Sequence, residues 1–227
     1  IRKCIIYVLS GLQGTNFPVS YTEIQNIGIQ YLKLVFGKDY HPGLRMMPKS
    51  FIGPSSNTLQ VKHITPFDED AQFPNVRHNY TVTDKADGMR KLLYINKDGK
   101  IYLIDTNMNV QFTGAVTKDV ELRETIIDGE HILHNKKGEF INLYASFDVY
   151  IINKKDVRNN SFIPNEGETT DDVSNKFRLP LLVKIIKGMG AVSVTDGGLP
   201  AIRIEHKNFK ADNISQSIFK CCHTILE

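Results

Sequence analysis

One lysine stands at a turn between two apolar runs in the stretch VTDKADGMRKLLYI, residues 82–95. A lysine amine attacks as a nucleophile only in its uncharged form, and with a reference pKa of about 10.4 it needs its surroundings to favour loss of the proton. Neighbouring cations and dry walls have this effect, and Lys85 has Arg90 and Lys91 close in sequence. We therefore interpret Lys85 as a candidate covalent nucleophile. The alternative for this turn alone is a hairpin tip with solvated charges.

Two more residues of the turn could shape a site around the lysine. Gly88 has no side chain, so its backbone can adopt a positive φ and approach a ligand closely. Asp87 can accept hydrogen bonds from backbone amides of the turn, which would leave Lys85 free to face a pocket. We predict that Asp87 and Gly88 lie at the edge of a ligand site.

Two later stretches also place polar residues inside apolar runs. TIIDGEHIL carries Asp128 and Glu130, and YASFDVYII carries Phe147 and Asp148. Carboxylates at the ends of strands can bind a divalent cation or orient a ligand. The two stretches are therefore candidates for the same site as the lysine turn.

The stretches with polar residues lie in a region rich in strand signals. From about residue 58, polar and apolar residues alternate in runs such as RKLLYIN, KIYLIDT, ETIIDGEHILH and EFINLYASFDVYII. Turn signals such as NKDGK and NKKGE separate the runs, and AIRIEHKNF adds one more strand near the end. The pattern predicts antiparallel sheet.

Helices are predicted on both sides of this region. SYTEIQNIGIQYLKLVFG begins with Ser20 and Glu23 in the spacing of a capping box and stops at Gly37. RLPLLVKIIKGM has Pro180 in its first turn, and DNISQSIFKCCHTILE ends the chain with an apolar stripe and a cap near Asp212 or Asn213. The fold class is therefore α+β, with antiparallel sheets flanked by helices. Prolines and glycines at 38–57 predict an irregular connector and a boundary there.

The bulk composition is that of an ordinary globular domain. The 227 residues are 41% hydrophobic, which allows a sizeable core, and the net charge of +3 is too small to establish a nucleic-acid partner. Three cysteines, none in a CxxC pair, favour a reduced compartment without structural zinc. His131 and His134 lie three apart on a predicted strand and make a poor metal pair. The run CIIYVL is too short to span a membrane, so we expect no membrane partner.

The order and spacing of the polar stretches resemble those of the covalent nucleotidyltransferases, the superfamily of mRNA capping guanylyltransferases and ATP-dependent ligases. The first motif of that superfamily is KxDGxR, matched here by Lys85, Asp87, Gly88 and Arg90. IIDGE looks like its third motif, and FDVYIINKKDVR looks like the motif that follows. With FIGPSSNTLQ upstream, the pattern is similar to the guanylyltransferase domain of the multifunctional capping enzymes of nucleocytoplasmic large DNA viruses, of the African swine fever virus type. The resemblance covers roughly residues 51–209 and implies the nucleotidyltransferase fold.

This resemblance implies an mRNA guanylyltransferase. Lys85 would attack the α-phosphate of GTP, release pyrophosphate and hold GMP as a phosphoramidate, and the GMP would pass to the 5′-diphosphate end of RNA. Mg²⁺ or Mn²⁺ would be needed, with Glu130 on the metal or on the ribose hydroxyls. Arg90 would contact the ribose, and Asp87 and Gly88 would line the nucleotide site.

The motif that follows the third one implies roles for three more residues. Phe147 would stack on the purine, but strict alternation also points it to the same face as Ala145 and Val149, where it would be core. Asp148 is expected to order the pocket rather than to react. Arg158 either binds phosphate or closes a turn.

The chain also departs from the family pattern. Thr106 stands where members often have an arginine that reaches the ribose, and Gly198 and Pro200 spoil TDGGLPAI as a second acid-glycine strand. Lys207 and Lys210 have the wrong separation for the KxK strand that grips the α-phosphate. The later motifs and the OB-fold are missing, so we expect the chain as given to be an incomplete catalyst.

The resemblance also suggests an arrangement for the whole polypeptide. Residues 1–50 would be a helical connector from a preceding module, and residues 51–227 the N-terminal part of the nucleotidyltransferase domain. An RNA triphosphatase module would precede this chain and a methyltransferase module would follow it. The location implied is the host cytoplasm, in the viral factory, or the virion.

Two other functions stay open on the sequence alone. An ATP-dependent DNA or RNA ligase would adenylylate the same lysine, and the first and third motifs do not separate it from a capping enzyme. A non-catalytic RNA-binding scaffold would keep the fold without the chemistry, and the missing later motifs would fit it.

Overall fold

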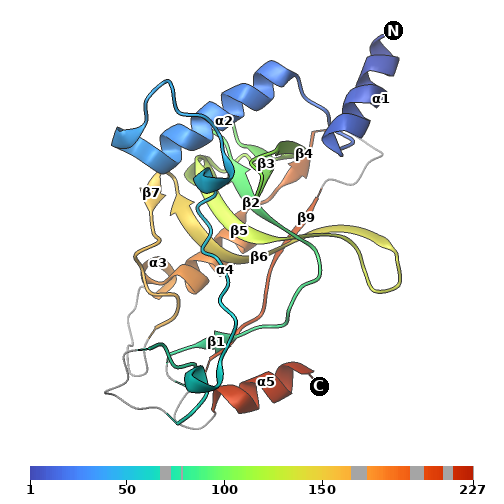
Figure 1. Ribbon diagram of the computed structural model, residues 1–227. Coiled ribbons are helices and arrows are strands. Elements are labelled where there is room, and N and C mark those ends of the chain that lie inside the picture. Colours follow the sequence, from blue (N-terminus) through green and yellow to red (C-terminus); the bar gives the residue numbers. More distant parts are fainter. Residues whose placement is uncertain (67–72, 78, 165–172, 195–201, 212–216, 227) are drawn as a thin grey trace.

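The computed structural model describes residues 1–66, 73–77, 79–164, 173–194, 202–211 and 217–226. Its centre is a curled eight-stranded sheet in the order β7-β6-β5-β2-β3-β4-β8, and β9 pairs with β6 (Figure 1). A separate two-stranded sheet joins β1 to β10. The predicted α+β class with antiparallel sheet is confirmed, with one exception, because β6 and β9 run parallel.

The elements have the following bounds. The strands are β1 (Thr81–Val82), β2 (Met89–Ile95), β3 (Lys100–Asp105), β4 (Val110–Val116), β5 (Thr125–His134), β6 (Phe140–Ile152), β7 (Lys155–Asp156), β8 (Val192–Ser193), β9 (Arg203–His206) and β10 (Lys210–Ala211). The helices are α1 (Arg2–Gln13), α2 (Tyr21–Phe36), α3 (Val173–Lys176), α4 (Arg178–Gly188) and α5 (Ile218–Leu226), and short 3₁₀ turns lie between them.

The large sheet buries an apolar layer on each face. Along β2, Leu92 and Tyr94 belong to the layer that includes α2, whereas Leu93 and Ile95 belong to the layer that includes α4. Successive side chains of a strand point to opposite faces, so a strand that is covered on both sides is apolar at almost every position. The continuous apolar run after Arg90 is therefore explained by burial on two faces.

Helix α2 begins where the sequence predicts, but its glutamate has a different partner. Ser20 Oγ accepts a hydrogen bond from the backbone amide of Glu23 at 3.1 Å. The Glu23 carboxylate reaches the sheet and accepts hydrogen bonds from Lys100 Nζ and Tyr102 Oη, both at 2.7 Å. Burial opposes ionisation of Glu23, yet these two bonds outweigh it and lower the pKa of the carboxyl group. The residue thus fastens the helix to β3.

The same helix packs on the sheet through its apolar stripe. Ile27, Tyr31 and Leu32 are buried, and Tyr31 Oη donates to the carbonyl of Ser50 at 2.7 Å. Helix α1, in contrast, has no buried residue. The boundary placed at residue 50 stays a prediction, although α2 contributes directly to the core beneath the sheet.

The last helix and the late loops are only partly described. Helix α5 confirms the predicted helix, but its proposed caps at residues 212 and 213 lie outside the described residues. So do most of TDGGLPAI and residues 165–172. Among the described helices, none has the length and apolar character needed to cross a membrane.

We expect Ile27→Ala to lower the free energy of unfolding of the sheet domain by about 2–4 kcal/mol, because it opens a cavity between α2 and the sheet. The matched control is Ile29→Ala on the same helix, where the side chain is 41% exposed and the expected loss is under about 1 kcal/mol. Urea denaturation followed by near-UV circular dichroism measures both. Equal effects would show that α2 is a connector without a part in the core.

Candidate active site

The lysine turn lies between β1 and β2, and its lysine is exposed. Lys85 Nζ donates to the carbonyl of Ala86 at 3.3 Å, a bond that leaves the amine accessible. Lys207, which follows β9, reaches the same turn: its Nζ donates to the carbonyl of Asp84 and lies 3.8 Å from Asp84 Oδ1. The structure therefore brings a second lysine to the candidate nucleophile.

The charges around Lys207 define the neighbourhood of the turn. Burial lowers the pKa of the Lys207 ammonium, whose side chain is 9% exposed, and the charge of Lys85 acts in the same direction. Asp84 and Glu130 oppose this shift. One lysine and two carboxylates, from two other parts of the chain, thus lie within electrostatic range of Lys207. Sequence reasoning considered Lys207 only as part of a KxK pair and missed its position.

The cations expected beside Lys85 point elsewhere. Arg90 and Lys91 are on β2, so their side chains leave the strand on opposite faces. Arg90 bonds Asp128, and Lys91 bonds Gln111 and His131. Among the described residues, the cation that contacts the turn is therefore Lys207. The expectation that Arg90 and Lys91 lie beside Lys85, which was based on their closeness in sequence, was wrong.

Gly88 is needed for space and not for an unusual backbone angle. Its φ lies outside the positive range, which corrects the expectation of a positive φ. A Cβ at this position would lie 2.6 Å from the carbonyl oxygen of His131 and 3.0 Å from Glu130 Cγ. The turn therefore packs tightly against β5, beside Glu130. Asp87 is exposed, and the expected bonds from its carboxylate to backbone amides are not found among the described residues.

A buried carboxylate holds Arg90. Asp128 is fully buried and accepts hydrogen bonds from Arg90 Nε at 3.2 Å, Arg90 Nη2 at 2.5 Å and Tyr150 Oη at 2.5 Å. The bond with Asp128 raises the pKa of the Arg90 guanidinium, which stays charged. This two-pronged arrangement fixes the plane of the guanidinium. The sequence placed Asp128 in a candidate site stretch without predicting that it holds Arg90, and it gave no role to Tyr150.

The guanidinium also anchors the segment before the sheet. Arg90 Nη1 donates to the carbonyl of Pro54 at 2.7 Å, and the guanidinium carbon lies 5.4 Å from the centre of the Phe51 ring. A Cβ on Gly53 would lie 2.4 Å from Arg90 Nη2, so this position needs glycine for the close approach. Three of the five N–H groups are occupied, which leaves two for a ligand.

Phe147 faces Arg90 because the strand alternation is broken. Gly129 pairs with Ser146 and Asp128 pairs with Asp148, so Phe147 is the extra residue of a bulge in β6. Its ring centre lies 5.8 Å from the Arg90 guanidinium carbon, whereas Val149 belongs to the core on the face of α4. Strict alternation, which placed Phe147 with Val149, was wrong for this reason.

The other predicted residues have defined partners. Glu130 is partly buried, and its backbone lies opposite that of Arg90 in the register of β5 against β2. Asp148 accepts hydrogen bonds from Arg178 at 2.9 and 3.2 Å, and although burial raises the pKa of its carboxyl group, this pair opposes the rise. Arg158 bonds Asp156 and closes a turn. In the part of the chain that is described, no group of three His, Cys, Asp or Glu residues could hold a metal ion.

We expect Asp128→Asn to lower the free energy of unfolding by about 2–4 kcal/mol, because the new amide brings a donor to the donors of Arg90 and Tyr150. The control is Asp156→Asn, whose partner Arg158 is 39% exposed and where the loss should stay below about 1 kcal/mol. Urea titration measures both variants. Similar losses in the two would contradict the central place given to Asp128.

Comparison with known proteins identifies the family of the chain. The family described as "mRNA capping enzyme, catalytic domain" matches residues 37–165, a range that includes Lys85, Arg90, Glu130 and Phe147. The chain is also 29% identical over 154 residues to a protein of Acanthamoeba polyphaga mimivirus named "Probable mRNA-capping enzyme". That match covers 68% of this chain but only 11% of the relative's length. The chain belongs to the family of mRNA capping enzyme catalytic domains.

Proposed function

We propose that this chain is part of an mRNA guanylyltransferase that forms a covalent lysine-GMP intermediate from GTP. The proposal is supported by Glu130, which lies between two groups that the reaction would use: Gly88 of the Lys85 turn packs beside Glu130, and Arg90, with Phe147 near it, is opposite Glu130 in the strand register. Nucleotidyl transfer needs a nucleophile next to a binding site that offers an aromatic surface to the base and polar groups to the sugar. Membership of the capping-enzyme family supports the choice of reaction.

In the proposed reaction, the neutral amine of Lys85 attacks the α-phosphorus of GTP. The bond to the pyrophosphate oxygen breaks, pyrophosphate leaves, and a P–N bond joins GMP to the lysine. The GMP then passes to the terminal phosphate of a 5′-diphosphate RNA, which regenerates the amine. Arg90 offers its two remaining N–H groups to the ribose, and Phe147 stacks on the base. Lys207 holds the carbonyl of Asp84 and so positions the turn.

The carboxylates near the turn fit a divalent cation. Mg²⁺ is bound in proteins by one or two carboxylates together with substrate phosphates and water, so a three-residue cage is not required. Glu130 would hold Mg²⁺ or Mn²⁺ or the ribose hydroxyls, and Asp84 is the other acid near Lys207. When bound, the ion would neutralise charge on the phosphoryl oxygens.

The larger context is proposed as well. The relative is a much longer protein, which fits a multifunctional viral capping enzyme of the African swine fever virus type. We propose a triphosphatase module and a methyltransferase module in the same polypeptide, and a location in the host cytoplasm or the virion. An ATP-dependent ligase remains the rival, since it would use the same lysine with a different nucleotide.

We expect Lys85→Ala in the full-length polypeptide to abolish covalent labelling by α-³²P-GTP and Mg²⁺, because the proposed P–N bond forms on the Lys85 amine and the amine of Lys207 is held at the carbonyl of Asp84. Lys97→Ala, at the exposed turn after β2, is the matched control and should label as the unchanged protein does. Gel electrophoresis after denaturation measures the label. Undiminished label on Lys85→Ala would favour the scaffold reading.

We also expect unlabelled GTP, but not ATP, to compete for the label at equal concentration. Preferential competition by ATP would identify a ligase.

We expect Glu130→Gln to lower the labelling rate at least 100-fold, a loss comparable with that caused by removing one electrostatic group that stabilises a transition state. The control is Glu139→Gln, at the tip of the β5–β6 hairpin, which should label at the rate of the unchanged protein. Equal rates for the two variants would contradict the role given to Glu130.

A further inference from the structure

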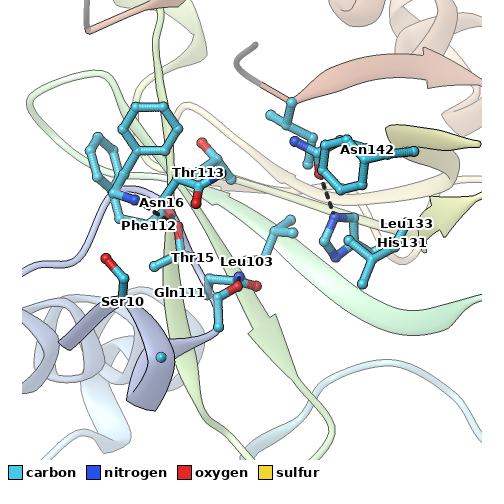
Figure 2. A pocket seen from close by; sticks show the side chains of 15 residues that line it. Ser10, Thr15, Asn16, Leu103, Gln111, Phe112, Thr113, His131, Leu133 and Asn142 are labelled. Carbon is cyan, nitrogen blue, oxygen red and sulfur yellow. Dashed lines mark hydrogen bonds between the residues drawn. The ribbon is translucent and has the colours of Figure 1, made fainter. Parts of the chain in front are cut away.

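A hollow with both polar and apolar walls lies on the face of the sheet opposite the Arg90 side chain. It has a volume of about 420 Å³, is partly open to solvent, and is lined by the end of α1 and the loop after it, by β4 and by the β5–β6 hairpin. Figure 2 shows His131 and Asn142 on one side of the hollow and Ser10, Thr15 and Gln111 on the other. Apolar walls come from Leu103, Leu133, Phe140 and Ile202.

A second hollow adjoins the first. Its volume is about 690 Å³, and both hollows are lined by Gly11, Gly14, Gln111, His131 and Leu133. Lys91 lines the larger hollow. The two together have the size of a site for a small molecule.

Lys91 is a buried cation whose hydrogen-bond partners carry no negative charge. It is 8% exposed, and its Nζ lies 2.8 Å from Gln111 Oε1 and 3.1 Å from His131 Nδ1. Burial lowers the pKa of the ammonium, and Asp105 opposes this. The Asp105 carboxylate is itself turned toward its own loop, where it accepts bonds from Asn107 and Asn109. An ammonium has three N–H donors, so one of them has no acceptor among the described residues.

His131 does not supply the missing negative charge. Its Nε2 lies 2.9 Å from Asn142 Oδ1, and burial lowers the pKa of the ring, an effect to which Lys91 adds. The ring is therefore neutral, accepts from Lys91 at Nδ1 and donates to Asn142 at Nε2. An anion beside Lys91 would offset the cost of burying its charge.

We infer that the two hollows bind a small molecule with one anionic group, a carboxylate or a phosphate, beside Lys91 in the larger hollow and a flat apolar body between Leu103, Leu133 and Phe140 in the smaller one. Among the described lining residues, the larger hollow has one lysine, Lys91, and one acid, Asp105, whose carboxylate is already bonded within its own loop. A single cation suits a single anionic group, whereas a nucleic-acid strand needs several. The inference is independent of the guanylyltransferase proposal, because it uses the opposite face of β2.

The test is titration calorimetry with benzoate and with phenyl phosphate, each compared with uncharged benzamide. We expect the better anion to bind with a Kd of about 1 mM or tighter, within the reach of a ligand of this size. Benzamide should bind at least tenfold more weakly. The tighter of the two anions identifies the chemical class of the natural group, and shifts of the His131 ring signals in NMR spectra would place it at this site.

Two variants and one control separate the site from adventitious binding. Lys91→Met should weaken anion binding at least tenfold, and Leu133→Trp should do the same by filling the hollow while keeping the charge. Lys97→Met, an exposed lysine after the same strand, should bind as the unchanged protein does. If Lys91→Met does not fold, Leu133→Trp and benzamide carry the test. Equal affinity for benzoate and benzamide, unchanged binding by Leu133→Trp, or no binding of either anion would overturn the inference.

Discussion

The buried ion pair between Asp128 and Arg90 is the interaction on which the candidate active site depends. Asp128 has no contact with solvent, so its charge is tolerated only because Arg90 and Tyr150 supply donors to it. The guanidinium that is held in this way fastens the segment at Phe51–Pro54 to the sheet and sits beside Phe147. One carboxylate on β5 therefore connects four segments that are distant in sequence, and it orients the side chain that we propose for ribose binding.

Strand β2 gives the domain two chemically different sides. Arg90 and Lys91 are adjacent in sequence and both are basic, yet Arg90 pairs with an acid and faces the candidate active site, whereas Lys91 has neutral partners and faces the hollows. The pleat of the strand is the cause, since it sends consecutive side chains to opposite faces. Two neighbouring cations thus have opposite electrostatic situations, one compensated and one open to an anion.

The sequence allowed the fold class, helix α2 with its Ser20 cap, and the strands that carry the motifs to be predicted, because local alternation and capping decide these features. The site was predictable only as a set of residue types. The bulge at Phe147 could not be derived, since a bulge depends on the register of β6 against β5 and leaves no local signal. The place of Lys207 was also hidden, because it results from the parallel pairing of β9 with β6.

These two non-local features act together on the same turn. The bulge moves the Phe147 ring to the side of Arg90, and the pairing of β9 carries Lys207 to the carbonyl of Asp84, directly before Lys85. Gly88 completes the arrangement, because only a residue without a side chain lets the turn pack on the carbonyl of His131. A lysine in a flexible loop would have many conformations, and restricting the loop to the reactive one would cost conformational entropy. Contacts before and after Lys85 restrict its backbone, so in the proposed reaction only the side chain of Lys85 would have to be ordered.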